Sequence, residues 1–162
     1  MGIKTGMNRI ILHTLLCVAA SLWFLAGTPA VSGADLALRS QLLWGTDQEK
    51  PRESTYKEVD PKVKGKLSRI FKWKHYFEIN QQKVTLEAND TKRLKLSAKC
   101  EIDVRFLDAH TLEIKLYGEG KWTKTIRQSV AALNRGELAV LAGDDKDKYG
   151  DAWFVVLSAD RP

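Results

Sequence analysis

Cysteine is scarce in this chain, with only Cys17 and Cys100 among its 162 residues. Cys17 lies in an apolar stretch near the start that is typical of a leader, so a processed chain would keep Cys100 alone. One thiol cannot form an internal disulfide, and we expect an ordinary hydrophobic core to hold the protein together. A chain of this size buries more than about 60% of its unfolded surface, which is enough for such a core.

Histidine is also scarce, and its placement argues against the common metal sites. Beyond the leader only His75 and His110 occur, and neither belongs to an HxH or HExxH motif. Cys100 shares strand parity with Ile102 and Val104, which predicts a buried, inert thiol instead of a nucleophile. The sequence contains no GxSxG motif. We therefore expect a protein that is not an enzyme and holds no metal or cofactor.

The acidic segment 145–151 resembles the start of an EF-hand loop, because acidic residues alternate along it before Gly150. Tyr149 stands where a side-chain oxygen is normally supplied, and Val156 stands where a bidentate glutamate is required. The segment is better interpreted as a solvated turn between two strands.

The first 34 residues predict a secretory signal peptide. Lys4 and Arg9 precede an apolar stretch from Ile10 to Leu25, and Ser32 and Ala34 fit the small residues of a cleavage site. The apolar stretch is shorter than the roughly 20 residues that cross a bilayer, so an uncleaved anchor is the weaker alternative. Cleavage after residue 34 leaves one exported domain, residues 35–162, in the periplasm or outside the cell, with no transmembrane segment.

The charge balance is compatible with anionic partners, but ordinary solubility is the simpler interpretation of a mildly basic domain. The chain has 26 basic and 20 acidic residues, and the leader contains two of the basic ones, Lys4 and Arg9, which leaves a formal charge of +4. Nucleic acid is a poor partner for an exported protein. The remaining partners are an anionic envelope polymer, a lipid surface or another protein.

Alternation of apolar residues predicts a mainly antiparallel sheet. Leu36–Trp44 is an opening strand, and 45–59 is polar enough to be a loop. Asp60-Pro61 is a helix start, followed by an apolar stripe that ends at Phe71. Short strands are then expected, separated by turns at 80–82, 88–90, 118–120 and 134–136; they are 76–79, 83–86, 92–96, 122–130, 138–142 and 152–157. The last two are apolar on both faces, which is typical of central strands.

The clearest pattern is a hairpin formed by 100–106 and 112–116. If Phe106 faces Leu112, the register places Arg105 opposite Glu113 and Asp103 opposite Lys115, with opposite charges in each pair. The prediction is an α+β fold of about seven strands, arranged as a sandwich or a partial barrel, with one short amphipathic helix.

The candidate binding residues are Lys72, Trp73, Lys74 and Tyr76, because basic and aromatic residues alternate there as they do in polyanion and sugar binders. The alternative is a junction between helix and strand, in which Trp73 packs in the core. Trp44, Trp122 and Trp153 are also expected in the core, although Trp44 borders the polar loop and could line an exposed patch.

The sequence resembles small exported bacterial domains of an uncharacterised family over nearly all of residues 35–162. The resemblance implies export and a compact domain, and it supplies no activity or ligand. The segments that carry it are Trp44-Gly45-Thr46-Asp47, the 60–78 region with Ile70-Phe71-Lys72-Trp73-Lys74-His75-Tyr76-Phe77-Glu78, Leu141-Ala142-Gly143-Asp144-Asp145 and Ala152-Trp153-Phe154-Val155-Val156. We expect an exported binding module, with a structural subunit of an envelope assembly as the alternative and a small hydrolase as the least favoured class.

Overall fold

The computed structural model describes residues 35–49, 55–143 and 150–160, which all belong to one compact unit over residues 33–162. The predicted leader and most of the candidate calcium loop lie outside the described residues.

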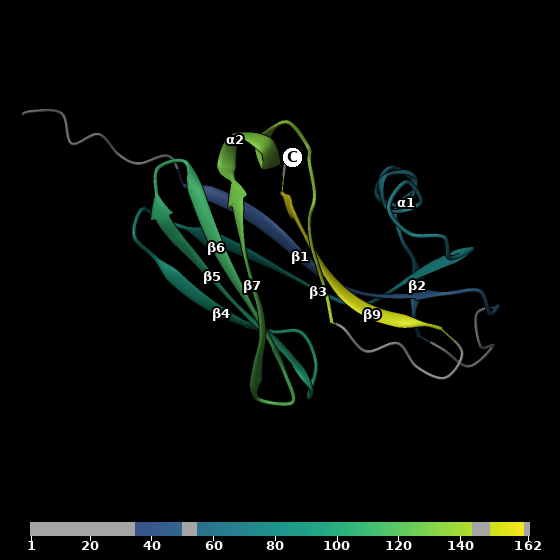
Figure 1. Ribbon diagram of the computed structural model, residues 1–162. Coiled ribbons are helices and arrows are strands. Elements are labelled where there is room, and N and C mark those ends of the chain that lie inside the picture. The colour runs from purple at the N-terminus through teal and green to yellow at the C-terminus, as the bar shows by residue number, and fades with distance from the viewer. Residues whose placement is uncertain (1–34, 50–54, 144–149, 161–162) are drawn as a thin grey trace, which may run out of the picture. The chain divides into compact units, whose positions relative to one another are not determined.

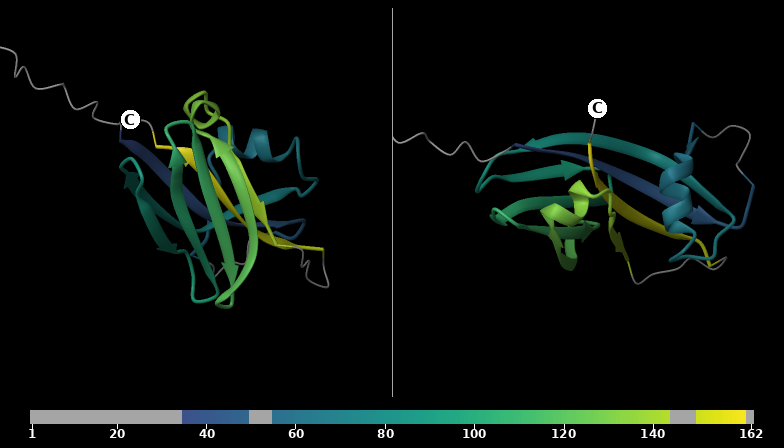
Figure 2. Two further views of the ribbon diagram at one scale, coloured as in Figure 1. Left: turned by 60° about the vertical axis from the view of Figure 1, so that its left-hand side comes forward. Right: turned by 90° about the horizontal axis from the view of Figure 1, so that it is seen from above.

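The described residues form two antiparallel sheets, as Figures 1 and 2 show, which confirms the predicted β-rich α+β fold. There are nine strands in place of about seven, and two short helices in place of one. Sheet A has the order β2 (Lys57–Glu58), β3 (His75–Leu86), β1 (Leu36–Thr46), β9 (Ala152–Ala159), β8 (Ala139–Ala142). Sheet B has the order β4 (Thr91–Lys95), β5 (Cys100–Asp108), β6 (Thr111–Gly118), β7 (Lys121–Ser129).

If β2 is left aside, the strands form a ring in chain order, from β1 through β3 and β4 round to β8 and β9. The ring closes because the last strand, β9, pairs with the first, β1, as in a barrel. No backbone ladder joins β3 to β4 or β7 to β8 within the described part of the chain, so the circle is split into two facing sheets. Side chains bridge both seams. The amides of Asn80 and Gln82 donate to the carbonyls of Leu96 and Lys95 at 2.8 and 2.7 Å, and Lys124 Nζ donates to the Ala142 carbonyl at 3.2 Å.

The main core lies between the sheets and takes the inward positions of both, including Leu38 from β1, Ile114 from β6 and Leu157 from β9. A second, smaller core lies on the outer face of sheet A, under α1 (Pro61–Leu67). It contains Leu43, Val59, Leu67, Tyr76, Phe154 and Val156. Sheet A is therefore covered on one face by sheet B and on the other, near one end, by α1.

Helix α1 begins as predicted, with Asp60 Oδ1 accepting from the Lys62 N–H at 2.8 Å. It ends at Leu67, earlier than the predicted stripe, and Ile70 is 61% exposed. The second helix, α2 (Val130–Asn134), was not predicted; Ser129 caps it by accepting from the Ala132 N–H.

Strand β3 corrects the predicted turn at 80–82. The strand runs unbroken through this segment, and its pairing with β1 shifts at Ile79, which is an extra residue opposite Leu42 and Leu43. The polar residues belong to the strand because Asn80 and Gln82 satisfy carbonyl groups across the seam. Strand β8 is a second correction, because it lies at the edge of sheet A and not in its centre.

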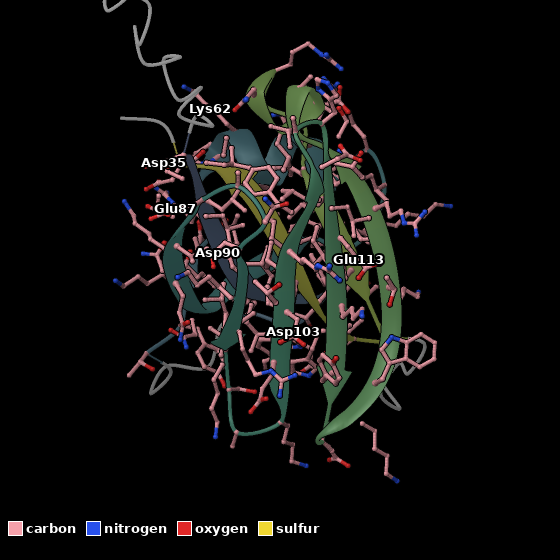
Figure 3. All side chains as sticks on the ribbon, turned by 90° about the vertical axis from the view of Figure 1, so that its left-hand side faces the viewer. Asp35, Lys62, Glu87, Asp90, Asp103 and Glu113 are labelled. Atoms are coloured by element: carbon pink, nitrogen blue, oxygen red, sulfur yellow. The ribbon has the colours of Figure 1, made fainter. Side chains whose placement is uncertain are left out.

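The predicted hairpin has the predicted register, with Phe106 opposite Leu112 and Asp103 opposite Lys115. Its charges form other ion pairs, however. Asp103 accepts from Arg93 of β4 at 2.6 Å, and Lys115 contacts Glu113 on its own strand at 3.3 Å. Figure 3 shows Asp103 and Glu113 on the face of sheet B that is turned toward the viewer.

Candidate functional site

One end of sheet A reaches past sheet B, toward α1 and β2, as Figure 1 shows. We call this end the sheet tip; β1 ends there at Thr46, β3 begins at His75 and β9 begins at Ala152. Two hydrogen bonds tie the segment before β3 to the tip. The Lys74 N–H donates to Asp47 Oδ1 at 2.9 Å, and Trp73 Nε1 donates to the Gly150 carbonyl at 3.0 Å.

Two of the predicted binding residues belong to the outer core and not to a surface. Tyr76 is 1% exposed, and its hydroxyl donates to the Phe71 carbonyl at 3.2 Å. Burial raises the pKa of this hydroxyl, which therefore stays protonated. Trp73 is half-buried, and its ring stacks on Phe154 with centroids 5.8 Å apart. Tyr76 is therefore removed from the predicted surface, whereas Trp73 packs against the outer core with part of its ring still exposed.

The two predicted lysines remain exposed and belong to a larger group of cations. Asp60 is the only carboxylate between residues 60 and 74. We call this group the basic segment; its members are Lys62, Lys64, Lys66, Arg69, Lys72 and Lys74. Lys66 Nζ donates to the Gly136 carbonyl. The other five side chains form no ion pair with any described residue.

The cations of sheet B differ in this respect, because several are neutralised by neighbouring carboxylates. Arg93 forms two hydrogen bonds to Asp103, and Lys99 contacts Glu119 at 2.9 Å. The hydrogen bond from Arg93 lowers the pKa of Asp103. Lys95, Arg105, Lys121 and Arg127 of sheet B form no ion pair with a described residue either, but they are spread over three strands. The basic segment instead places all of its cations between residues 62 and 74.

The opposite face of the sheet tip carries an open group of aromatic rings, which we call the aromatic shelf: Trp44, Tyr56, Phe77 and Trp153. Trp44 and Trp153 are cross-strand partners and stack with centroids 5.8 Å apart. Tyr56 meets both of these rings edge-on, at 6.2 and 6.4 Å. Trp153 is 45% exposed.

Sequence reasoning assigned Trp44 and Trp153 mainly to the core. The two residues share the inward parity of Leu42 and Val155, so their alternation is that of core positions. The one available signal was the position of Trp44 next to a polar segment. Trp153 is open, although Phe77 beneath the shelf is only 1% exposed, because sheet B ends before it reaches this end of sheet A (Figure 1).

The titratable groups do not converge on a catalytic arrangement in the described part of the chain. Burial raises the pKa of the Cys100 thiol to about 11, so the reactive thiolate is scarce at neutral pH. His75 stacks on Phe77 at the sheet tip, whereas His110 lies in the β5–β6 turn. Among the described residues, no group of three or more His, Cys, Asp or Glu side chains is placed to hold a metal ion. None of the described helices is long and apolar enough to span a membrane.

A cavity of about 490 Å³ opens near the start of β1, at the end away from the sheet tip. Two carboxylates on its rim already have partners: Asp108 accepts from the His110 N–H, and Asp160 contacts Arg39 and Lys83. Hydrogen bonds from Lys83 and Arg39 lower the pKa of Asp160. Hydrogen bonds thus lower the pKa of both of these carboxyl groups, which is the opposite of the shift that a general acid needs. The lining of the cavity includes Leu36, Ala37, Phe106, Val130, Asn134 and Ala159.

No known protein family, curated protein or solved structure matches the chain. The resemblance to small exported bacterial domains therefore stays a prediction. The features that bear on function are therefore those of the sheet tip and the basic segment.

Proposed function

We propose that this protein is an exported, non-enzymatic domain that binds an anionic lipid surface of the cell envelope through its basic segment. One observation carries the proposal: none of the six cations in this segment has a carboxylate partner among the described residues, whereas Arg93, Lys99 and Lys115 of sheet B have one. Unpaired cations on one face attract a dense array of negative charges.

A lipid surface fits better than an anionic polysaccharide because of Ile70. This side chain is 61% exposed and lies between Arg69 and Lys72, where it packs in neither core. A bilayer offers phosphate groups to the cations and an apolar layer to an exposed aliphatic side chain, while an anionic polysaccharide offers charged and hydroxyl groups but no apolar layer. Each lysine or arginine near an anionic membrane contributes about 1 kcal/mol of binding free energy.

Vesicle sedimentation tests this proposal with the protein purified from cells that express the full chain. We expect binding to phosphatidylglycerol vesicles that weakens as salt rises, and little binding to phosphatidylcholine vesicles. The double substitution Lys72→Gln and Lys74→Gln should weaken binding by about 2 kcal/mol, roughly 30-fold.

The matched control removes two exposed lysines of sheet B, Lys95→Gln and Lys121→Gln, and so changes the net charge equally. We expect this control to retain most of the affinity. Equal losses in the two double variants would mean that net charge and not the basic segment drives binding. Retention on an anionic polysaccharide without vesicle binding would replace the lipid with a polymer ligand, and failure of both would favour a protein partner.

A further inference from the structure

The sheet tip brings the basic segment and the aromatic shelf to the same end of sheet A. Lys74 is hydrogen-bonded to Asp47, just beyond the end of β1, and Trp73 is hydrogen-bonded to Gly150, just before β9. Trp153 is the second residue of β9. Lys74 and Trp153 therefore lie at the same end of sheet A, on segments that hydrogen bonds hold to the sheet tip.

The aromatic shelf is a filled surface and not a cage. Its rings lie against one another, with centroid distances from 5.7 to 6.4 Å, so no gap is left among them for a small ligand. The exposed part of the Trp153 ring can therefore be buried only by a binding partner. Tryptophan and tyrosine with one side wet are the residues that favour the layer between lipid head groups and acyl chains.

Exposure alone does not mark a membrane contact, as Trp122 shows. Trp122 is 63% exposed, but its Nε1 donates to Thr125 Oγ1 on the same strand at 2.9 Å. It faces Tyr117 on the outer face of sheet B, where Arg93 lies over the Tyr117 ring. Trp122 therefore lies next to a pair of side chains that already contact each other, whereas Trp153 stacks in an aromatic cluster at the same end of sheet A as the basic segment.

We propose that the aromatic shelf is a second membrane contact, and that the sheet tip enters the head-group layer of an anionic bilayer end-on. In this arrangement Lys72 and Lys74 meet phosphate groups while Trp153 and Trp44 lie at the boundary with the acyl chains. The inference rests on the proposed lipid binding and adds the orientation of the protein on the bilayer. The partner is the bilayer interface, chosen because the shelf is continuous with the basic segment around one sheet end.

The test compares two exposed tryptophans of the same chain on phosphatidylglycerol vesicles. Trp153→Ala should weaken binding about tenfold, because roughly half of a large aromatic side chain loses its burial in the interface. Trp122→Ala should leave binding within about twofold of the original protein. Trp153→Phe repeats the measurement with a milder change if the alanine variant does not fold, and it should lose less affinity than the alanine variant.

Fluorescence gives a second readout that does not depend on affinity. With brominated acyl chains in the vesicles, tryptophan emission should be quenched equally in the original protein and in the Trp122→Phe variant, and to a smaller extent in the Trp153→Phe variant, which keeps Trp44 at the boundary. One outcome would overturn the shelf contact and leave the proposed function intact. In that outcome vesicle binding depends on Lys72 and Lys74, but the Trp153 and Trp122 variants have equal affinity and equal quenching. Absence of vesicle binding by the original protein would overturn both.

Discussion

The two faces of the sheet tip carry nearly identical aromatic stacks with different surroundings. On the outer face Trp73 stacks on Phe154 at 5.8 Å with 12° between the ring planes, and on the open face Trp44 stacks on Trp153 at 5.8 Å with 13°. The outer stack lies in a core under α1, whereas the open stack leaves Trp153 45% exposed. Ring geometry alone therefore does not distinguish a core from a surface.

The difference arises from the path of the chain. After β2 the chain forms α1 and the 68–74 segment on the outer face only, while sheet B stops short of the tip on the open face (Figures 1 and 2). Aromatic burial on the outer face contributes to folding. The same kind of surface on the open face remains available for a partner.

The largest expected effect is that of Phe154→Ala on the covered face. Phe154 is 1% exposed and contacts Phe71, Trp73 and Tyr76. Loss of such a ring leaves a cavity, and we expect the free energy of unfolding to fall by about 3–5 kcal/mol. Urea denaturation measures this. A loss below about 1 kcal/mol would show that the outer cluster is not a core.

Gly45→Ala tests the tight packing of the same face. A methyl group at Gly45 would lie 2.7 Å from Cδ2 of Trp73, so the indole ring must shift. We expect a loss of about 1–3 kcal/mol, read from the urea midpoint. Gly65→Ala is the control, because a methyl group in α1 meets no atom within 4 Å and should stabilise the helix by up to about 1 kcal/mol. Equal effects of the two changes would contradict the tight contact.

Tyr76→Phe removes one buried hydrogen bond and leaves the ring in place. The Phe71 carbonyl loses its hydroxyl donor, so we expect the free energy of unfolding to fall by about 1 kcal/mol. The same denaturation experiment detects this, and vesicle binding should be unchanged because Tyr76 is buried. A variant that folds normally but loses vesicle binding would return Tyr76 to the predicted binding site.

Trp153→Ala should have the smallest effect on stability, below about 1 kcal/mol, because it removes one exposed ring from a stack on the open face. Comparison with Phe154→Ala, one residue along β9, gives the sharpest contrast between the faces. A loss for Trp153→Ala as large as that for Phe154→Ala would mean that the two faces are equivalent in folding.

The sequence predicted those parts of the fold that depend on local pattern. The register of β5 and β6 follows from alternation, and the start of α1 follows from Asp60-Pro61. The unbroken course of β3 could not be predicted, because Asn80 and Gln82 resemble turn residues until their carbonyl partners across the seam are known. Helix α2 is too short for an apolar period to mark it.

For the candidate site too, the sequence predicts local properties and not tertiary packing. Lys72 and Lys74 are exposed, as a run of charge suggests. The exposure of Tyr76 and Trp153 depends on whether another element covers their face of the sheet tip. That is a property of the tertiary structure. Alternating patterns place both residues equally well in a core.

The pairing of β1 with β9 has a consequence for the order in which the chain folds. Sheet B is a run of consecutive hairpins, which need only short loops to close. In sheet A the partners are remote in sequence; Arg39 and Asp160, which are bonded to each other, lie 121 residues apart. Until the last strand is in place, β1 presents an unpaired edge with apolar neighbours, which is the kind of surface that aggregates. We expect sheet B to form early and sheet A to form late. The pairing of β9 with β1 should then be the rate-limiting step of folding.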